Sequence, residues 1–241
     1  MTGIGAVSVL VSGLRTAEGP AFDRAGNLYF VDWERSAVIR RTSVGELSEW
    51  VNTGGIPAGL AFDREGNLYI ADEGDDIHGI LRVTPEREIT TLVDAYEGVP
   101  LNGANDLVFA ADGTLYFSDP WRSSLANPIG GFYRLFRGPD GRLERIDSGL
   151  AFPNGVAIDA AGTAVYLAET QHRRILRYAI GADGAMGPRE HWADLSGEPG
   201  PDGMAFDAQG NLYVAHYGGG GWRSLGGMVR PPVRSPSLAR T

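Results

Sequence analysis

Apolar and polar residues follow a pattern that recurs five times along this chain. Each unit has a short apolar run, a polar turn that ends in glycine, and a second apolar run rich in aromatic residues. The unit at 58–73 reads AGLAFDREGNLYIADE, and the other four align with it on one apolar anchor. The anchors are Phe22, Phe62, Phe109, Ile158 and Phe206, at steps of 40, 47, 49 and 48 residues. Two apolar runs joined by a tight turn predict a β-hairpin in every unit.

Further apolar runs after most hairpins predict a third and a fourth strand. They lie at 38–41 and 47–51 after the first hairpin, and at 80–83 and 89–93 after the second. Four antiparallel strands repeated every 40–50 residues or so are typical of the blades of a β-propeller. Because a single blade cannot bury both of its faces, we expect the units to stack in a ring. The alternative is a β-sandwich whose turns are evenly spaced by coincidence.

The number of blades follows from the strands in each unit. The first four units have four candidate strands each, whereas the fifth has two and ends near Tyr217. We therefore predict an all-β, six-bladed propeller that is incomplete, with about five blades encoded and a truncated or out-of-frame C-terminus. The apolar run at 6–11 is expected to serve as the outer strand of the last blade. A complete five-bladed ring is the alternative.

The end of the chain differs in composition from the repeats. Residues 222–241 contain four Arg, three Pro and no acidic residue. Since Pro cannot continue a central strand, we predict a propeller domain over 1–221 and an irregular basic tail over 222–241.

The position four residues before each anchor predicts a binding site. Innermost strands of a propeller line its central channel, so equivalent positions converge at one mouth. Four of the five carry side-chain oxygens on otherwise apolar strands, and glycine follows in four units, which lets the backbones approach closely. The five residues are Glu18, Ala58, Asn105, Asn154 and Asp202. We call them the inner ring.

Carboxylate and amide oxygens that converge on one axis indicate a site for a hard divalent cation. Without His or Cys ligands, such a site favours Ca²⁺, Mg²⁺ or Mn²⁺ over zinc. Glu18 and Asp202 would balance the two charges of the ion. The alternative is that these side chains cap the strand ends through water.

A second set of polar residues lies ten or eleven positions after each anchor. The second strand of each hairpin returns to the same mouth, so these residues could form a second shell around the site. An aspartate at a strand end is equally often a turn-former. The set, which we call the outer ring, is Asp32, Asp72, Asp119, Glu169 and His216. His216 differs from the rest because a histidine near a metal could shuttle a proton.

Composition excludes several classes of function. The chain has 241 residues, a net charge of −9 and no cysteine, which excludes disulfides, zinc–thiolate sites and cysteine nucleophiles. The negative charge argues against nucleic-acid or anionic-membrane partners, and we expect a small-molecule substrate instead. No apolar run reaches the length of a membrane span, and no signal peptide is recognisable. We therefore predict a cytoplasmic protein.

Four short motifs resemble those of a known family. They are E-G-P at 18–20, N-D at 105–106, P-N-G at 153–155 and P-D-G-M at 201–204. In this order they resemble the senescence marker protein (regucalcin), gluconolactonase and luciferin-regenerating enzyme family, over about residues 6–221. The resemblance implies a six-bladed, calcium-dependent propeller that hydrolyses lactones. Mg²⁺, Mn²⁺ or Zn²⁺ are possible substitutes for calcium.

The resemblance also implies roles for individual residues. Glu18, Asn154 and Asp202 correspond to metal ligands, and Asn105 to a fourth ligand or a substrate contact. Asp202 corresponds to the catalytic residue, acting as base or nucleophile. Regucalcin-like members carry an Arg where this chain has Gly103, which counts against an aldonolactone substrate.

Two other function classes remain open at this point. The family also includes organophosphate hydrolases, so the pocket could cleave phosphotriesters instead of lactones. The chain could also be a propeller without catalytic activity, either a binding ring or an inactive truncated form.

Overall fold

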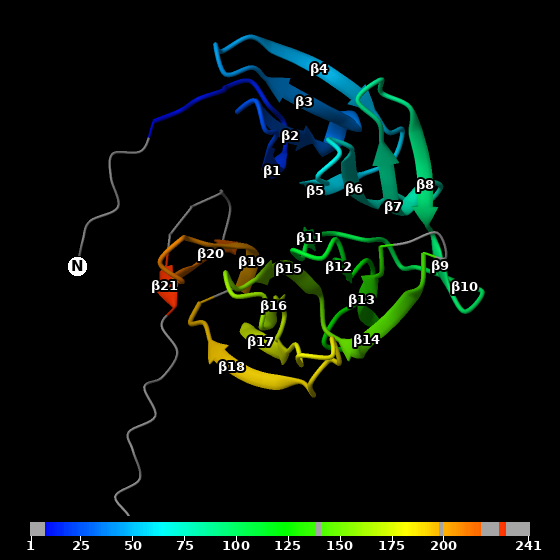
Figure 1. Ribbon diagram of the computed structural model, residues 1–241, viewed down its shortest axis with the longest axis vertical. Coiled ribbons are helices and arrows are strands. Elements are labelled where there is room, and N and C mark those ends of the chain that lie inside the picture. The colour runs from blue at the N-terminus through cyan, green and yellow to red at the C-terminus, as the bar shows by residue number, and fades with distance from the viewer. Residues whose placement is uncertain (1–7, 138–140, 198–199, 218–226, 230–241) are drawn as a thin grey trace, which may run out of the picture.

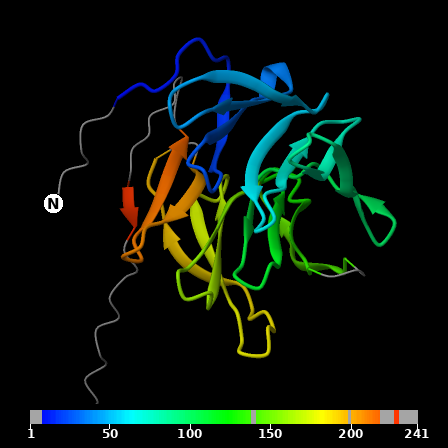
Figure 2. The same cartoon turned by 45° about the horizontal axis from the view of Figure 1, so that its top comes forward.

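The computed structural model describes residues 8–137, 141–197, 200–217 and 227–229. These residues form strands and one short 3-10 turn, η1 (Trp33–Arg35). Figure 1 shows the strands gathered into sheets that lie side by side around a common centre, with one strand of each sheet innermost. Figure 2 shows the same succession of sheets in a turned view, from blue at the first to orange at the fifth.

Four of the sheets have four strands each, and we call them blades one to four. Blade one is β1 (Ala17–Phe22), β2 (Leu28–Asp32), β3 (Ala37–Arg41) and β4 (Leu47–Asn52); blade two is β5 (Pro57–Phe62), β6 (Leu68–Glu73), β7 (His78–Val83) and β8 (Ile89–Val93). Blade three is β11 (Leu107–Phe109), β12 (Leu115–Asp119), β13 (Gly130–Leu135) and β14 (Leu143–Leu150); blade four is β15 (Pro153–Ile158), β16 (Ala164–Glu169), β17 (Arg174–Ala179) and β18 (Glu190–Asp194). In each blade the strands pair in chain order and run antiparallel.

Two smaller sheets complete the fold. The fifth sheet has three strands, β19 (Gly200–Phe206), β20 (Leu212–Tyr217) and β21 (Gly227–Val229). A two-stranded sheet, β9 (Ala95–Tyr96) with β10 (Val99–Pro100), lies on the connection between blades two and three. The all-β fold and the repeat of four-stranded blades are confirmed. The six-bladed ring stays a prediction.

An aspartate closes the turn of most hairpins. Asp63 Oδ1 accepts hydrogen bonds from the backbone N–H groups two and four residues further on, at 2.9 and 2.8 Å, and Oδ2 accepts one from Asn67 Nδ2 at 2.7 Å. Asp23 and Asp207 make the same three contacts. Gly66 adopts a φ of +88°, which glycine reaches without steric cost. The D-x-x-G-N sequence therefore fixes where each hairpin turns.

The hydrophobic core lies between consecutive blades. Each of the first four apolar clusters joins side chains of one sheet to those of the next. The apolar anchors take part: Phe62 packs edge-on against Tyr29 of blade one, with ring centroids 4.9 Å apart. The same contact recurs between Tyr69 and Phe109 and between Tyr166 and Phe206. The anchors thus hold each blade to the one before it.

The segment before β1 covers the opposite face of blade one. Val11 and Leu14 pack against Phe30, Ala37 and Ile39. Residues 8–16 contain no strand, so the prediction of an outer strand over 6–11 is wrong for the part that the structure describes. Val11 and Leu14 cover blade one, whereas Val9 and Leu10 are exposed.

The short strand β21 lies inside the segment 222–241 that the sequence set apart as an irregular tail. It pairs with β20, from Leu212 opposite Val229 to Val214 opposite Gly227. The rest of that segment lies outside the described residues. No helix of the described part has the length and hydrophobicity needed to cross a membrane.

Candidate active site at the centre of the blades

All five inner-ring residues line one cavity of about 460 Å³. Each belongs to an innermost strand of Figure 1 or lies just before one. The inner ring is therefore brought together from five separate sheets, as the repeat predicts. The remaining lining is mostly glycine and apolar side chains, including Met204 and Val214.

An irregularity in the strand ladder occurs at the inner-ring position. In β1 the pairing with β2 shifts register between Glu18 and Ala21. The same shift occurs in β5, β15 and β19, between Pro57 and Leu60, Pro153 and Val156, and Pro201 and Met204. A β-bulge inserts an extra residue into one strand and changes the direction of a side chain. The inner-ring residue lies within this irregular stretch in all four strands.

Glycines next to the inner ring let neighbouring blades touch. A Cβ on Gly19 would lie 2.1 Å from Ala58 O, and one on Gly155 would lie 2.3 Å from Asp202 O. Gly59 has the same relation to Asn105 O, at 2.6 Å. Such distances are far below van der Waals contact, so only glycine fits. The side chains of the inner ring are thus held close together by direct backbone contact between blades.

Blade three breaks this pattern, because Asp106 stands where the other units have glycine. Its Oδ2 accepts a hydrogen bond from Val156 N in blade four at 2.7 Å, and its Oδ1 accepts one from Leu107 N at 2.8 Å. Asp106 therefore joins two blades by a hydrogen bond where glycine joins them by close approach. Burial raises the pKa of Asp106 to about 7, although both backbone donors oppose the shift.

The cavity concentrates negative charge. The pKa of Glu18 is raised to about 8, mainly by burial and in addition by the nearby charges of Asp202, Glu73 and Asp106. Burial also raises the pKa of Asp202, against a hydrogen bond from Asn154. None of the described residues that line the cavity is an arginine or histidine. Like charges in a poorly solvated space are destabilising unless a proton or a cation neutralises them.

Both asparagines of the inner ring are held by a carboxylate. Asn105 Nδ2 donates a hydrogen bond to Glu73 Oε1 at 2.8 Å. The side chain of Asn154 is hydrogen-bonded to the carboxylate of Asp202. The amide of Asn105 therefore presents its nitrogen to Glu73, and its oxygen is left for the cavity.

These donors fit a hard cation. Among the described residues, no three His, Cys, Asp or Glu side chains are grouped closely enough to hold a metal by themselves. A cation here would therefore need the amide oxygens of Asn105 and Asn154 beside the carboxylates of Glu18 and Asp202. Mixed carboxylate and amide ligation is typical of Ca²⁺.

The four carboxylates of the outer ring have a structural task. Asp119 Oδ1 accepts a hydrogen bond from Gly103 N at 2.7 Å, and Asp72 Oδ1 accepts one from Ile56 N at 2.7 Å. Asp32 and Glu169 accept equivalent bonds from the backbone that enters β1 and β15. All four are at most 1 % exposed. Each therefore clamps the incoming chain to its own blade.

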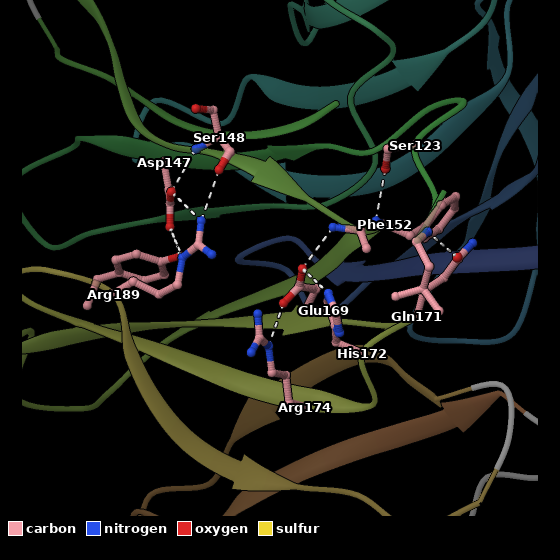
Figure 3. A network of polar contacts seen from close by, with 12 residues as sticks. Ser123, Asp147, Ser148, Phe152, Glu169, Gln171, His172, Arg174 and Arg189 are labelled. Atoms are coloured by element: carbon pink, nitrogen blue, oxygen red, sulfur yellow. Dashed lines mark hydrogen bonds and ion pairs between the residues drawn. The ribbon is translucent and has the colours of Figure 1, made fainter. Parts of the chain in front are cut away.

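Figure 3 shows the clamp of blade four. Glu169 Oε1 accepts the hydrogen bond of Ala151 N at 2.8 Å, while Oε2 pairs with Arg174 Nε at 2.6 Å. His172 approaches the same carboxylate at 3.8 Å. Next to it, Phe152 N donates to Ser123 Oγ at 2.9 Å, which ties the same entering segment to blade three.

His216 occupies the outer-ring position of the fifth sheet, opposite Pro201. Its Nε2 is buried and has no hydrogen-bond partner among the described residues. It is not part of the described lining of the cavity. Proton transfer by His216 stays a prediction.

Two polar residues beside the cavity were not singled out from the sequence. Asp106 could have been found, because it breaks the glycine pattern after the inner ring. Glu73 follows the outer-ring residue Asp72, and no repeated feature marks it. Its approach to Asn105 depends on how blades two and three pack.

Comparison with known proteins identifies the family. A family model described as the SMP-30/Gluconolactonase/LRE-like region matches residues 16–225. The chain belongs to this family. The resemblance seen in the four motifs is therefore confirmed.

Relatives within the family include hydrolases of two kinds. The gluconolactonase of Zymomonas mobilis is 30% identical, over 88% of this chain and 68% of the relative. The diisopropyl-fluorophosphatase of Loligo vulgaris is 28% identical, over 84% of this chain and 72% of the relative. A solved gluconolactonase structure from Xanthomonas campestris has a TM-score of 0.75 and 27% identity, over 86% of this chain and 72% of that one.

Proposed function

We propose that this protein is a divalent-metal-dependent hydrolase of lactones, with calcium as the preferred ion. The observation that carries the proposal is the single cavity lined by all five inner-ring positions, four of which bear carboxylate or amide oxygens. Similarity to gluconolactonases supports the reaction class. We also propose that the protein acts in the cytoplasm, on a small-molecule substrate.

Glu18, Asn105, Asn154 and Asp202 would hold the ion, or Asn105 would contact the substrate. A bound divalent cation supplies Lewis-acid polarisation of the ester carbonyl. Asp202 is the catalytic residue: it removes a proton from the attacking water, or attacks the carbonyl carbon itself. Met204 and Val214 give the cavity an apolar wall for the body of the substrate.

The proposal is tested with Asp202→Asn and a panel of lactones. We expect a loss of turnover of about 10²-fold or more with the melting temperature nearly unchanged. Asp207→Asn is the matched control, because Asp207 is a turn residue five positions further on that lies outside the cavity lining. Full lactone turnover by Asp202→Asn would refute the catalytic role.

Hydrolysis of phosphotriesters is the second candidate. It is favoured by the similarity to a diisopropyl-fluorophosphatase. The surroundings of Gly103 count against an aldonolactone, because the arginine that regucalcin-like members carry at this position could not be accommodated here. A Cβ there would lie 2.8 Å from Trp121 Cβ and 3.0 Å from Glu73 Cα, so no longer side chain fits at this position. Rates on lactones and on phosphotriesters, measured with the same preparation, separate the two candidates.

A six-bladed ring remains our proposal for the complete architecture. Gly203 follows the inner-ring residue of the fifth sheet, and a Cβ there would meet no described residue within 4 Å. Phe22, the anchor of blade one, is 67 % exposed. Both residues mark edges against which a further blade would pack.

A further inference from the structure

We propose that Glu73 is a positioning residue, which fixes the amide of Asn105 so that its carbonyl oxygen faces the cavity. This inference rests on the proposed metal site and deepens it. It assigns a function to a carboxylate that neither the repeat nor the outer ring explains.

Glu73 is itself held in place. It is the last residue of β6, and its backbone N–H donates to Ile56 O at 2.9 Å. Glu73 is 8 % exposed, and its backbone packs against Gly103. A side chain fixed at the end of a strand can orient a neighbour because little freedom remains to it.

The hydrogen bond determines which way the amide points. Asn105 Nδ2 donates to Glu73 Oε1 at 2.8 Å, so the amide presents its nitrogen to this carboxyl group and its Oδ1 to the other side. The backbone of Asn105 is fixed as well, because its N–H donates to Ser118 O at 3.1 Å. No hydrogen bond to Asn105 Oδ1 occurs within the described part of the chain. This oxygen is therefore available to a cation or a substrate.

Glu73 has no ion-pair partner among the described residues, and Asn105 is the one side chain there that hydrogen-bonds to its carboxyl group. A buried carboxylate with a single amide partner adds little to stability. Orientation of a ligand explains its presence better. Residues behind the ligands of a metal commonly change metal affinity by about tenfold to a hundredfold when they are replaced.

The first test is Glu73→Met, which removes the acceptor and keeps most of the volume. We expect calcium affinity, measured by isothermal titration calorimetry, to fall about tenfold to a hundredfold. Glu73→Gln should fall less, because glutamine can either accept from or donate to the amide. Glu169→Gln is the matched control: it alters a buried carboxylate whose hydrogen bonds go to Ala151 and Arg174 and not to an inner-ring side chain, and it should leave calcium affinity unchanged. Wild-type affinity in Glu73→Met, or an equal loss in the control, would overturn the inference.

A second variant pair covers the case in which Glu73→Met fails to fold. Asn105→Asp places two carboxylates in contact and should abolish calcium binding. Adding Glu73→Gln should restore part of it, since the glutamine nitrogen can donate to Asp at position 105. A double variant that binds no better than Asn105→Asp contradicts the inference.

The orientation can also be measured without metal. The side-chain NH₂ resonances of Asn105, identified by their loss in Asn105→Asp, should shift in Glu73→Gln in calcium-free buffer. Unchanged resonances would overturn the positioning role by themselves. A wild-type protein that binds no calcium while these resonances shift would instead refute the proposed metal site and leave the hydrogen bond established.

Discussion

The inner and outer rings both contain carboxylates and use them in opposite ways. Inner-ring residues line a shared cavity, and the glycines beside them touch the next blade. The outer-ring carboxylates are wholly buried and bind the backbone of their own blade. The first set gathers charge that no described hydrogen-bond donor fully offsets. The second set gives its oxygens to backbone N–H groups, although burial still raises the pKa of Asp72 and of Asp119.

This difference separates binding from stability. A carboxylate surrounded by N–H donors stabilises the folded chain, and its removal leaves those donors without acceptors. A carboxylate crowded by other carboxylates destabilises the chain until a ligand arrives. Substitutions in the two rings should therefore have opposite effects on the metal-free protein.

The largest effect is expected in the outer ring. Asp119→Ala removes the acceptor of Asn102 N, Gly103 N and Asn102 Nδ2, and should lower the free energy of unfolding by roughly 3 kcal/mol or more. Chemical denaturation measures the loss. Asp112→Ala, which removes an acceptor in an exposed turn, is the control and should cost under about 1 kcal/mol. Equal losses would show that burial of the clamp is unimportant.

The contacts between blades predict the next effect. Gly155→Ala should destabilise the protein by about 2–4 kcal/mol, because the new methyl group would lie 2.3 Å from Asp202 O. Gly203→Ala, at the equivalent position of the fifth sheet, meets nothing within 4 Å and should change stability by less than about 0.5 kcal/mol. Thermal unfolding of the two variants compares the edge of blade four, which is packed against the fifth sheet, with the edge of the fifth sheet. Equal melting temperatures would contradict the description of both edges.

A smaller effect, of opposite sign, is expected in the inner ring. Glu18→Gln should stabilise the metal-free protein at pH 8 by roughly 1–2 kcal/mol, because it removes one of the crowded charges. The same variant should bind calcium at least about tenfold more weakly. Melting temperatures with and without calcium measure both changes. Destabilisation of the metal-free variant would show that Glu18 stabilises the fold as the outer-ring carboxylates do.

The smallest effect concerns pH. The pKa of Glu18 is raised from 4.5 to about 8 in the folded protein, so the folded state binds its proton more tightly than the unfolded state. Its contribution to stability is therefore complete below about pH 4.5 and is lost as the pH rises toward 8. The melting temperature of the metal-free protein should fall across this range by a few degrees more than that of Glu18→Gln. Identical pH profiles would contradict the shift.

The sequence predicts the inner ring because its members occupy equivalent positions in a repeat. One offset from each anchor identifies all five positions, and their convergence follows from the symmetry of stacked blades. The strands at 38–41, 47–51, 80–83 and 89–93 are confirmed for the same reason. Periodic features are averaged over several units, so a local exception does not obscure them.

Features that occur once could not be predicted in this way. An aspartate at a strand end fits both a second shell and a backbone clamp, and only the contacts of Asp72 and Asp119 distinguish them. The contact of Glu73 with Asn105 depends on the packing of two blades. Residues 8–11 are apolar enough for a strand, and their pattern does not reveal that Val11 packs on blade one while Val9 and Leu10 stay exposed.

The irregular stretch that carries the inner ring has a consequence for how such a protein can diversify. The regular ladder resumes at Ala21, Leu60, Val156 and Met204, just beyond the inner-ring residues. The mouth of the channel can therefore change its chemistry residue by residue while the sheets keep their pairing. Ala58 is the inner-ring residue without a polar side chain. A polar residue could replace it without a change in strand pairing.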